Sequence, residues 1–229
     1  MPEQTPRTLN HFSLFRFSDA YYRLETEERK EFRHQWLNGL RQAAQAVYVY
    51  QGYPLSPGGD ILVWSALEAD EPAAAGKFFT DFACATNPFR PLLQPGEALW
   101  GFTKPSQYTK TRSTQEIDPF AETRQPYLIM YPFVKTVDWY LMGREARQGM
   151  MNEHIRIGKG YPAITQLLLY SFGLQDQEFI VVYETEDLNQ FSDLVYELRA
   201  SDARRYTERD TPLFTGMYHP AEETLALWG

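Results

Sequence analysis

The chain has 229 residues and a formal net charge of −8, with 22 Lys and Arg against 30 Asp and Glu. Binding to a phosphate backbone draws its affinity from Lys and Arg, so this acidic balance disfavours a nucleic-acid partner. Cys84 is the only cysteine, which excludes an intrachain disulfide and a multi-cysteine metal site. Neither a membrane span nor a secretory signal pattern is present, and we expect a cytoplasmic protein.

The first half of the chain alternates strand and helix patterns. Residues 25–46 are typical of an amphipathic helix, because Phe32, Trp36 and Leu40 recur at i, i+4 and i+8 with charged residues between them. Runs of β-branched and aromatic residues predict strands, and Pro and Gly mark turns. The expected order is a strand at 11–24, the helix at 25–46, paired strands at 47–50 and 60–67, a helix at 72–86 and a strand at 98–102.

The second half repeats this order after a polar segment, residues 106–124, which we interpret as a linker. Strands are expected at 127–135, 166–172, 178–184 and 211–218, with helices at 143–160 and 187–203, the second one beginning at a capping-box pattern. Each half therefore has the βαββαβ order of a ferredoxin-like unit. We predict an α+β fold of two ferredoxin-like halves, residues 1–115 and 116–229, whose sheets cover each other.

Two segments of the second half gather side chains that can do chemistry. Side chains alternate along a strand, so Tyr131 and Lys135 project to the same side of the strand at 127–135. In the helix that follows, Met150, His154 and Ile157 lie at i, i+4 and i+7, which places the imidazole on the stripe that faces the core.

The residues alone leave the role of these side chains open. A core-facing His154 is more often a hydrogen-bonded structural residue than a ligand, Tyr131 can be a packed aromatic, and Lys135 can be a solvated charge at a strand end. The sequence has no HExxH and no Cys–His spacing, so a zinc site is not expected. A single axial histidine can hold haem iron without such a cluster.

Several short motifs follow one another in order between Tyr127 and Gly216. They are Tyr131-Pro-x-x-Lys135, Trp139-Tyr-Leu, Glu153-His154, Tyr161, Gln166, Gly173-Leu-x-Asp, Leu194-Val-Tyr-Glu-Leu-Arg199, Tyr206 and Phe214-Thr-Gly. In this order and spacing the segment resembles the chlorite dismutase-like haem proteins, and within them the coproheme decarboxylases.

The resemblance implies a dimeric α+β barrel with haem, as coproheme or haem b, and its iron bound in the C-terminal half. It implies that His154 is the proximal iron ligand. In the relatives, a Glu carboxylate hydrogen-bonds the other ring nitrogen of the proximal histidine. Asp202 lies near the position of that Glu in this sequence. Tyr131 matches the tyrosine that becomes a radical and oxidises a propionate, and Lys135 matches the lysine beside it.

The distal position separates the branches of the family, because chlorite dismutases carry Arg there. In this chain the matching residue is Gln166 if one residue is deleted after Tyr161, and Leu167 if none is. Neither residue is Arg, so the resemblance favours peroxide-driven decarboxylation of coproheme to haem b. A chlorite dismutase-like peroxidase and a non-catalytic haem-binding barrel are the alternatives. The resemblance also implies a homo-oligomer, a pentamer, and leaves Arg112 and Arg124 as candidates for the propionate-binding arginine.

Overall fold

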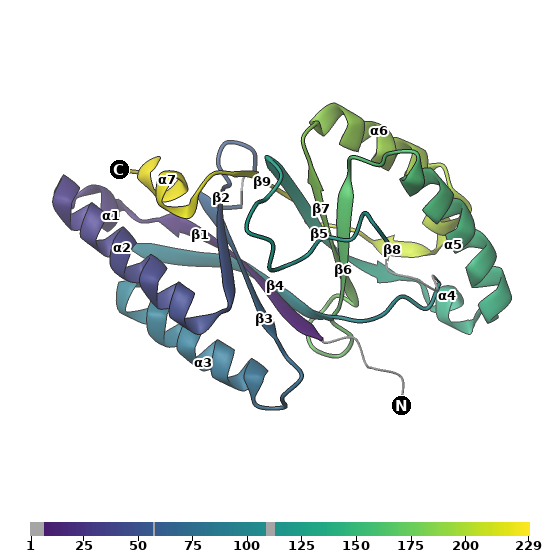
Figure 1. Cartoon of the computed structure of the whole chain (residues 1–229), viewed down its shortest axis with the longest axis horizontal. Coiled ribbons are helices and arrows are strands. Elements are labelled where there is room, and N and C mark those ends of the chain that lie inside the picture. The colour runs from purple at the N-terminus through teal and green to yellow at the C-terminus, as the bar shows by residue number, and fades with distance from the viewer. Residues whose placement is uncertain (1–6, 57, 109–112) are drawn as a thin grey trace.

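The computed structural model describes residues 7–56, 58–108 and 113–229 (Figure 1). None of the helices in this part of the chain is both long enough and apolar enough to cross a membrane. The elements in chain order are β1 (Thr8–Phe17), α1 (Asp19–Tyr22), α2 (Thr26–Ala43), β2 (Ala46–Gln51), β3 (Ile61–Glu68), α3 (Ala74–Thr86), η1 (Asn87–Phe89), β4 (Leu93–Thr103), β5 (Tyr127–Lys135), α4 (Val137–Leu141), α5 (Arg144–Lys159), β6 (Thr165–Tyr170), β7 (Phe179–Thr185), α6 (Leu188–Arg199), η2 (Asp202–Tyr206), β8 (Thr207–Arg209), β9 (Phe214–Tyr218) and α7 (Ala221–Ala226).

The strands form one large antiparallel sheet in the order β7-β6-β4-β1-β3-β2-β9-β5-β8. Because β5 also pairs with β7, the strands from β7 to β5 close into a ring. The first half contributes β4-β1-β3-β2 and the second half β9-β5-β7-β6, with the short β8 pairing beyond β5. If β8 is left out of the count, both halves place their four strands in the same spatial order, fourth, first, third, second. The predicted α+β fold with two like-ordered halves is confirmed at this level, and the boundary between residues 115 and 116 stays a prediction.

Two short strand pairings, the β4–β6 seam and the β2–β9 seam, join the halves, and each contains a glycine. In the β4–β6 seam a Cβ on Gly101 would lie 2.8 Å from the Tyr170 carbonyl oxygen, and in the β2–β9 seam a Cβ on Gly216 would lie 2.8 Å from the Cβ of Tyr50. Both distances are too short for a side chain, so glycine allows the two backbones to approach. Gly101 and Gly216 are on the last strand of their respective halves.

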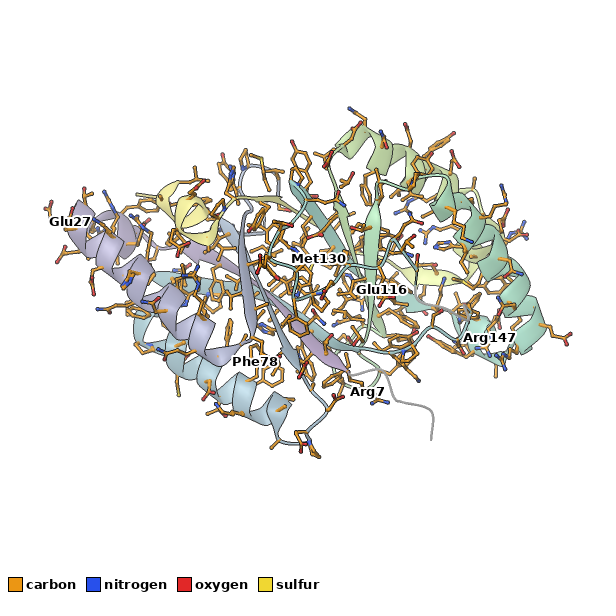
Figure 2. The ribbon with its side chains drawn as sticks, viewed as in Figure 1. Arg7, Glu27, Phe78, Glu116, Met130 and Arg147 are labelled. Carbon is orange, nitrogen blue, oxygen red and sulfur yellow. The ribbon has the colours of Figure 1, made fainter. Side chains whose placement is uncertain are left out.

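The interior of the ring is a core to which both halves contribute. The first half supplies Phe12, Tyr50 and Trp64, among others, and the second half supplies Leu128 and Met130. Figure 2 shows Met130 among the central strands and Phe78 between the sheet and α3. The helices lie outside the ring, with α2 and α3 over the first half and α5 and α6 over the second (Figure 1).

Some predicted elements end elsewhere in the structure. The strand expected at 11–24 runs from Thr8 to Phe17, because the Ser18 hydroxyl accepts hydrogen bonds from the backbone N–H groups of Ala20 and Tyr21 and begins α1. The predicted helix start at Asp187 is confirmed, since its carboxylate accepts from two backbone N–H groups. The sequence pattern did not predict α4, η2, β8 and α7, which are short.

Between β4 and β5 the described residues from Ser113 onward form no named helix or strand, as the linker interpretation of residues 106–124 expects, but they pack closely against the second half. Gln115 donates from its side-chain amide to the carbonyls of Gly158, Tyr161 and Ile164 at 3.0–3.3 Å, and Ile117 is buried in the ring interior. The segment is short of apolar residues, so its polar contacts left no periodic signal.

Candidate functional site

The outer face of β5, β7 and β6 carries most of the predicted site. The strand register places side chains on this face in three rows across β6, β7 and β5: Gln166–Tyr183–Ile129, Leu168–Val181–Tyr131 and Tyr170–Phe179–Phe133. Tyr131 and Gln166 therefore project to the same side of the sheet, as alternation predicts. Leu128 and Met130 project the other way, into the ring interior.

His154 lies on α5, the helix that covers this face. Its Nδ1 is buried and has no hydrogen-bond partner among the described residues. Burial, with the positive charge of Lys135 as a second cause, lowers the pKa of the imidazole to about 4, while Glu153 acts weakly in the other direction. The imidazole is therefore neutral at pH 7 and keeps a lone pair that can ligate a metal.

Lys135 ends β5 and reaches toward η2 and β8. Its ammonium donates to the Ala203 carbonyl at 3.4 Å and to Oγ1 of Thr207 at 3.0 Å, and it lies 4.8 Å from the centre of the Trp139 ring. Burial is the main cause that lowers its pKa to about 8. Lys135 is thus charged at neutral pH and lies within electrostatic range of His154, although it does not extend along the strand to the Tyr131 phenol.

Tyr131 is a half-buried phenol in the middle of the outer face. Its ring centre is 6.2 Å from that of Tyr183. Burial is the main cause that raises the pKa of Tyr131, and interaction with the Tyr183 hydroxyl opposes it. At neutral pH the phenol keeps its proton, so any one-electron oxidation of Tyr131 must also release that proton.

The two candidates for the distal position lie on opposite faces. Gln166 has an exposed side chain on the outer face, where α5 also lies. Leu167 is 3% exposed and belongs to the core inside the ring. Only Gln166 can therefore approach a ligand held between α5 and the sheet, and its distal role stays a prediction.

The structure does not bring Asp202 to His154. The Asp202 side chain is 70% exposed, and its carboxylate lies 3.6 Å from Nε of Arg205. Only the backbone N–H of Asp202 reaches α5, where it donates to the Glu153 carboxylate at 3.3 Å. In this conformation the expected carboxylate–histidine hydrogen bond is absent from the described contacts, because η2 turns the Asp202 side chain outward.

Neither candidate for the propionate-binding arginine is placed at this face. Arg112 lies outside the described residues. The Arg124 side chain is 2% exposed, lies 3.4 Å from the Glu184 carboxylate and stacks 4.7 Å from the Tyr48 ring centre. Arg124 and Glu184 line a cleft to which no residue of α5 contributes. Arg124 anchors the connecting segment to the ring interior instead of facing α5.

Sequence reasoning missed a charged cluster beside Tyr131. Arg199 at the end of α6 and Arg204 in η2 both pair with Asp210, at 3.0 and 3.5 Å. The charges of all three act on Tyr131, and those of Arg204 and Asp210 also act on Lys135. Arg199 ends the motif Leu194-Val-Tyr-Glu-Leu-Arg199, but no spacing rule pairs it with a carboxylate eleven positions later.

Apolar side chains on the same face are open to solvent. Leu168, in the middle of β6, is 38% exposed, and Phe172, just after that strand, is 45% exposed. None of the described His, Cys, Asp and Glu side chains forms a group of three or more that could hold a bare metal ion. An apolar face, an unpartnered neutral imidazole and nearby cations together fit a flat carboxylated porphyrin whose iron takes one axial histidine.

The fold and these side chains thus define an α+β protein with a candidate porphyrin site in its second half. The model of the chlorite dismutase family matches residues 26–219, and the chain belongs to that family, which confirms the resemblance drawn from the motifs. Enzymes of this family are haem-dependent, so membership supports haem and iron as cofactor.

Individual relatives carry two different names. A coproheme decarboxylase from Mycolicibacterium smegmatis is 31% identical over 180 residues, covering 78% of this chain and 75% of the relative. A chlorite dismutase from Ideonella dechloratans is 25% identical over 223 residues, covering 92% and 76%. The structure of a chlorite dismutase variant from Candidatus Nitrospira defluvii superimposes with a TM-score of 0.82 at 24% identity, covering 96% and 95%, which shows the shared fold.

Proposed function

We propose that this protein is a haem-dependent oxidoreductase that uses peroxide to remove propionate carboxyl groups from coproheme, giving haem b. The observation that carries the proposal is that Tyr131 and an uncharged Gln166 share the sheet face over which α5 lies, while His154 of that helix lies within electrostatic range of Lys135 at the end of β5. The relative named coproheme decarboxylase, at 31% identity, supports the same choice. A dimeric α+β barrel, a homopentamer and a cytoplasmic location belong to this proposal as well.

Each residue has a role that its surroundings allow. Neutral His154 would ligate iron, and the orphaned Nδ1 leaves one ring nitrogen for a second contact. Iron coproporphyrin, both substrate and cofactor, would supply peroxide-dependent oxidising chemistry when bound. Tyr131 would lose an electron and its phenolic proton to form a radical that begins loss of a propionate carboxyl as CO2. Lys135, charged at neutral pH, would attract a carboxylate at the end of β5 that faces η2 and β8.

The chlorite dismutase-like alternative requires a different distal group. A cationic Arg stabilises a developing oxyanion, and Gln166 cannot supply that charge. Arg199 and Arg204, whose charges act on Tyr131, already pair with Asp210. Slow or absent oxygen release from chlorite is therefore the expected result.

The test compares wild type with Tyr131→Phe. Phenylalanine keeps the ring packing on the outer face and removes the O–H from which the radical must form. Both proteins should bind iron(III) coproporphyrin, but after peroxide addition only wild type should yield decarboxylated porphyrins by mass spectrometry. A wild type that binds coproheme and leaves all its propionates intact would overturn the decarboxylase proposal. Equal conversion by Tyr131→Phe would keep the enzyme and remove Tyr131 from its mechanism.

A further inference from the structure

Asp210 holds two arginines at the edge of the candidate site with a single carboxylate oxygen. Oδ2 of Asp210 lies 3.0 Å from Nη2 of Arg199 and 3.5 Å from Nη1 of Arg204. The Asp210 side chain is 18% exposed, whereas the arginines are 48% and 34% exposed. Asp210 is therefore the most buried member of the cluster.

The cluster has spare capacity for a further carboxylate. Nη1 of Arg204 is buried, and no hydrogen-bond partner of proper geometry reaches it among the described residues. Lys135, Arg199 and Arg204 carry one positive charge each, and Asp210 and Glu178, which both act on Lys135, carry one negative charge each, which leaves a net charge of +1. Guanidinium groups bind carboxylates through paired, charge-assisted hydrogen bonds, so this edge favours a ligand rich in carboxylates.

We propose that Asp210 is an internal competitor for the ligand's carboxylates: it occupies Arg199 and Arg204 in the ligand-free chain and must be displaced when a propionate binds there. This inference rests on the proposed function and adds a basis for discrimination among porphyrins. An incoming propionate must replace the existing ion pair with Asp210. Each propionate therefore contributes less binding free energy than it would if Arg199 and Arg204 were unpaired. Asp210 thereby limits affinity for the four-propionate porphyrin and narrows its advantage over a porphyrin with two propionates.

The test removes the charge of Asp210 and measures binding without catalysis. Iron-free coproporphyrin, with four propionates, and iron-free protoporphyrin, with two, are titrated into wild type and Asp210→Asn, and the Kd values are read from porphyrin fluorescence. Two partly exposed ion pairs released together should tighten coproporphyrin binding by about tenfold. Protoporphyrin binding should tighten by no more than about threefold, and the coproporphyrin effect should shrink as salt screens the charges.

A matched control removes a neighbouring charge. Glu208 is an exposed carboxylate on β8, two residues before Asp210, so Glu208→Gln changes the net charge equally without freeing either arginine. Its ratio of the two Kd values should stay at the wild-type level. Arg199→Gln should weaken coproporphyrin binding more than protoporphyrin binding and should remove most of the gain from Asp210→Asn in the double variant.

The outcomes separate this inference from the proposed function. If wild type binds porphyrins and Asp210→Asn leaves the Kd ratio unchanged, or Glu208→Gln alters it equally, the competitor role is wrong and the proposed function stands. If wild type binds neither porphyrin, the proposed function fails and the inference fails with it. Thermal unfolding checks that each variant is folded, and if Asp210→Asn is not, Asp210→Ser is titrated in its place and the same ratio of Kd values decides.

Discussion

The two halves of the molecule share a strand order but differ in what their helices cover. In the first half, α2 buries Phe32, Trp36, Leu37, Leu40 and Ala43 against the sheet, whereas α5 of the second half has no residue that is fully buried. The first-half helix also begins at a capping box on Glu25, while α5 begins at Gly143 without a side-chain cap. One half thus closes its outer face with buried side chains, and the other packs its covering helix less completely.

The contrast extends to the two strongly desolvated histidines. His11 and His154 both have a pKa lowered to about 4, with burial as the main cause, and in both Nδ1 has no partner among the described residues. The His11 ring lies 4.8–5.9 Å from three phenylalanine rings of α3, which fill the space around it. His154 lies instead beside Lys135 on a face where apolar side chains remain exposed. A lowered pKa alone therefore does not identify a ligand, and the surroundings decide.

The largest expected effect separates these histidines. His154→Ala should abolish the histidine-ligated Soret spectrum that appears when wild type is titrated with iron(III) coproporphyrin, because it removes the proposed axial ligand. His11→Phe, which fits an aromatic environment, should keep that spectrum. Absorbance titration of both variants is the measurement, with circular dichroism to check folding. An unchanged spectrum in folded His154→Ala would show that His154 is not the iron ligand.

A smaller effect separates the two helices by their packing. Leu40 in α2 is 0% exposed, so Leu40→Ala should lower the free energy of unfolding by about 3 kcal/mol through lost transfer energy and a cavity. Ile157 in α5 is only partly buried, so Ile157→Ala should cost about 1 kcal/mol in the porphyrin-free protein. Urea denaturation with matched m-values gives both numbers. Equal costs would mean that α5 packs as firmly as α2.

A further effect on stability, smaller than that of Leu40→Ala, is the pH dependence that His11 contributes. Its folded-state pKa is below the unfolded value, so stability is intact above the unfolded pKa and falls as pH drops, because the unfolded chain takes up a proton that the folded chain refuses. A folded pKa of about 4 against about 6.5 unfolded predicts a loss of about 2 kcal/mol between pH 8 and pH 5.

The matched variant for this prediction is His11→Phe, which removes the titrating group from the same aromatic surroundings. Urea denaturation at pH 8 and pH 5 should show a shallower acid loss in His11→Phe than in wild type. The same loss in both proteins would assign the acid sensitivity to other groups, with His154 of the second half the next candidate.

Much of the fold and part of the site were determined by the sequence by itself. Alternation along residues 127–135 correctly placed the Tyr131 side chain on the opposite face of the sheet from Leu128 and Met130. The apolar stripe at i, i+4 and i+7 placed His154 on the side of α5 that meets the sheet. These features are local, because the period of a strand or helix is written into neighbouring residues. The ordered motifs then indicated the family, which no single residue could do.

Only the tertiary structure decided which distant side chains meet. The sequence showed no residue repeat between the halves, yet Gly101 and Gly216 lie at equivalent seams because two backbones approach there. Arg124 was a candidate for the ligand face and instead lies within the ring beside Glu184. Asp210 meets Arg199 because the chain returns through η2 and β8. Polar partners far apart in sequence leave no periodic pattern, since their pairing depends on how the strands close and where each turn directs a side chain.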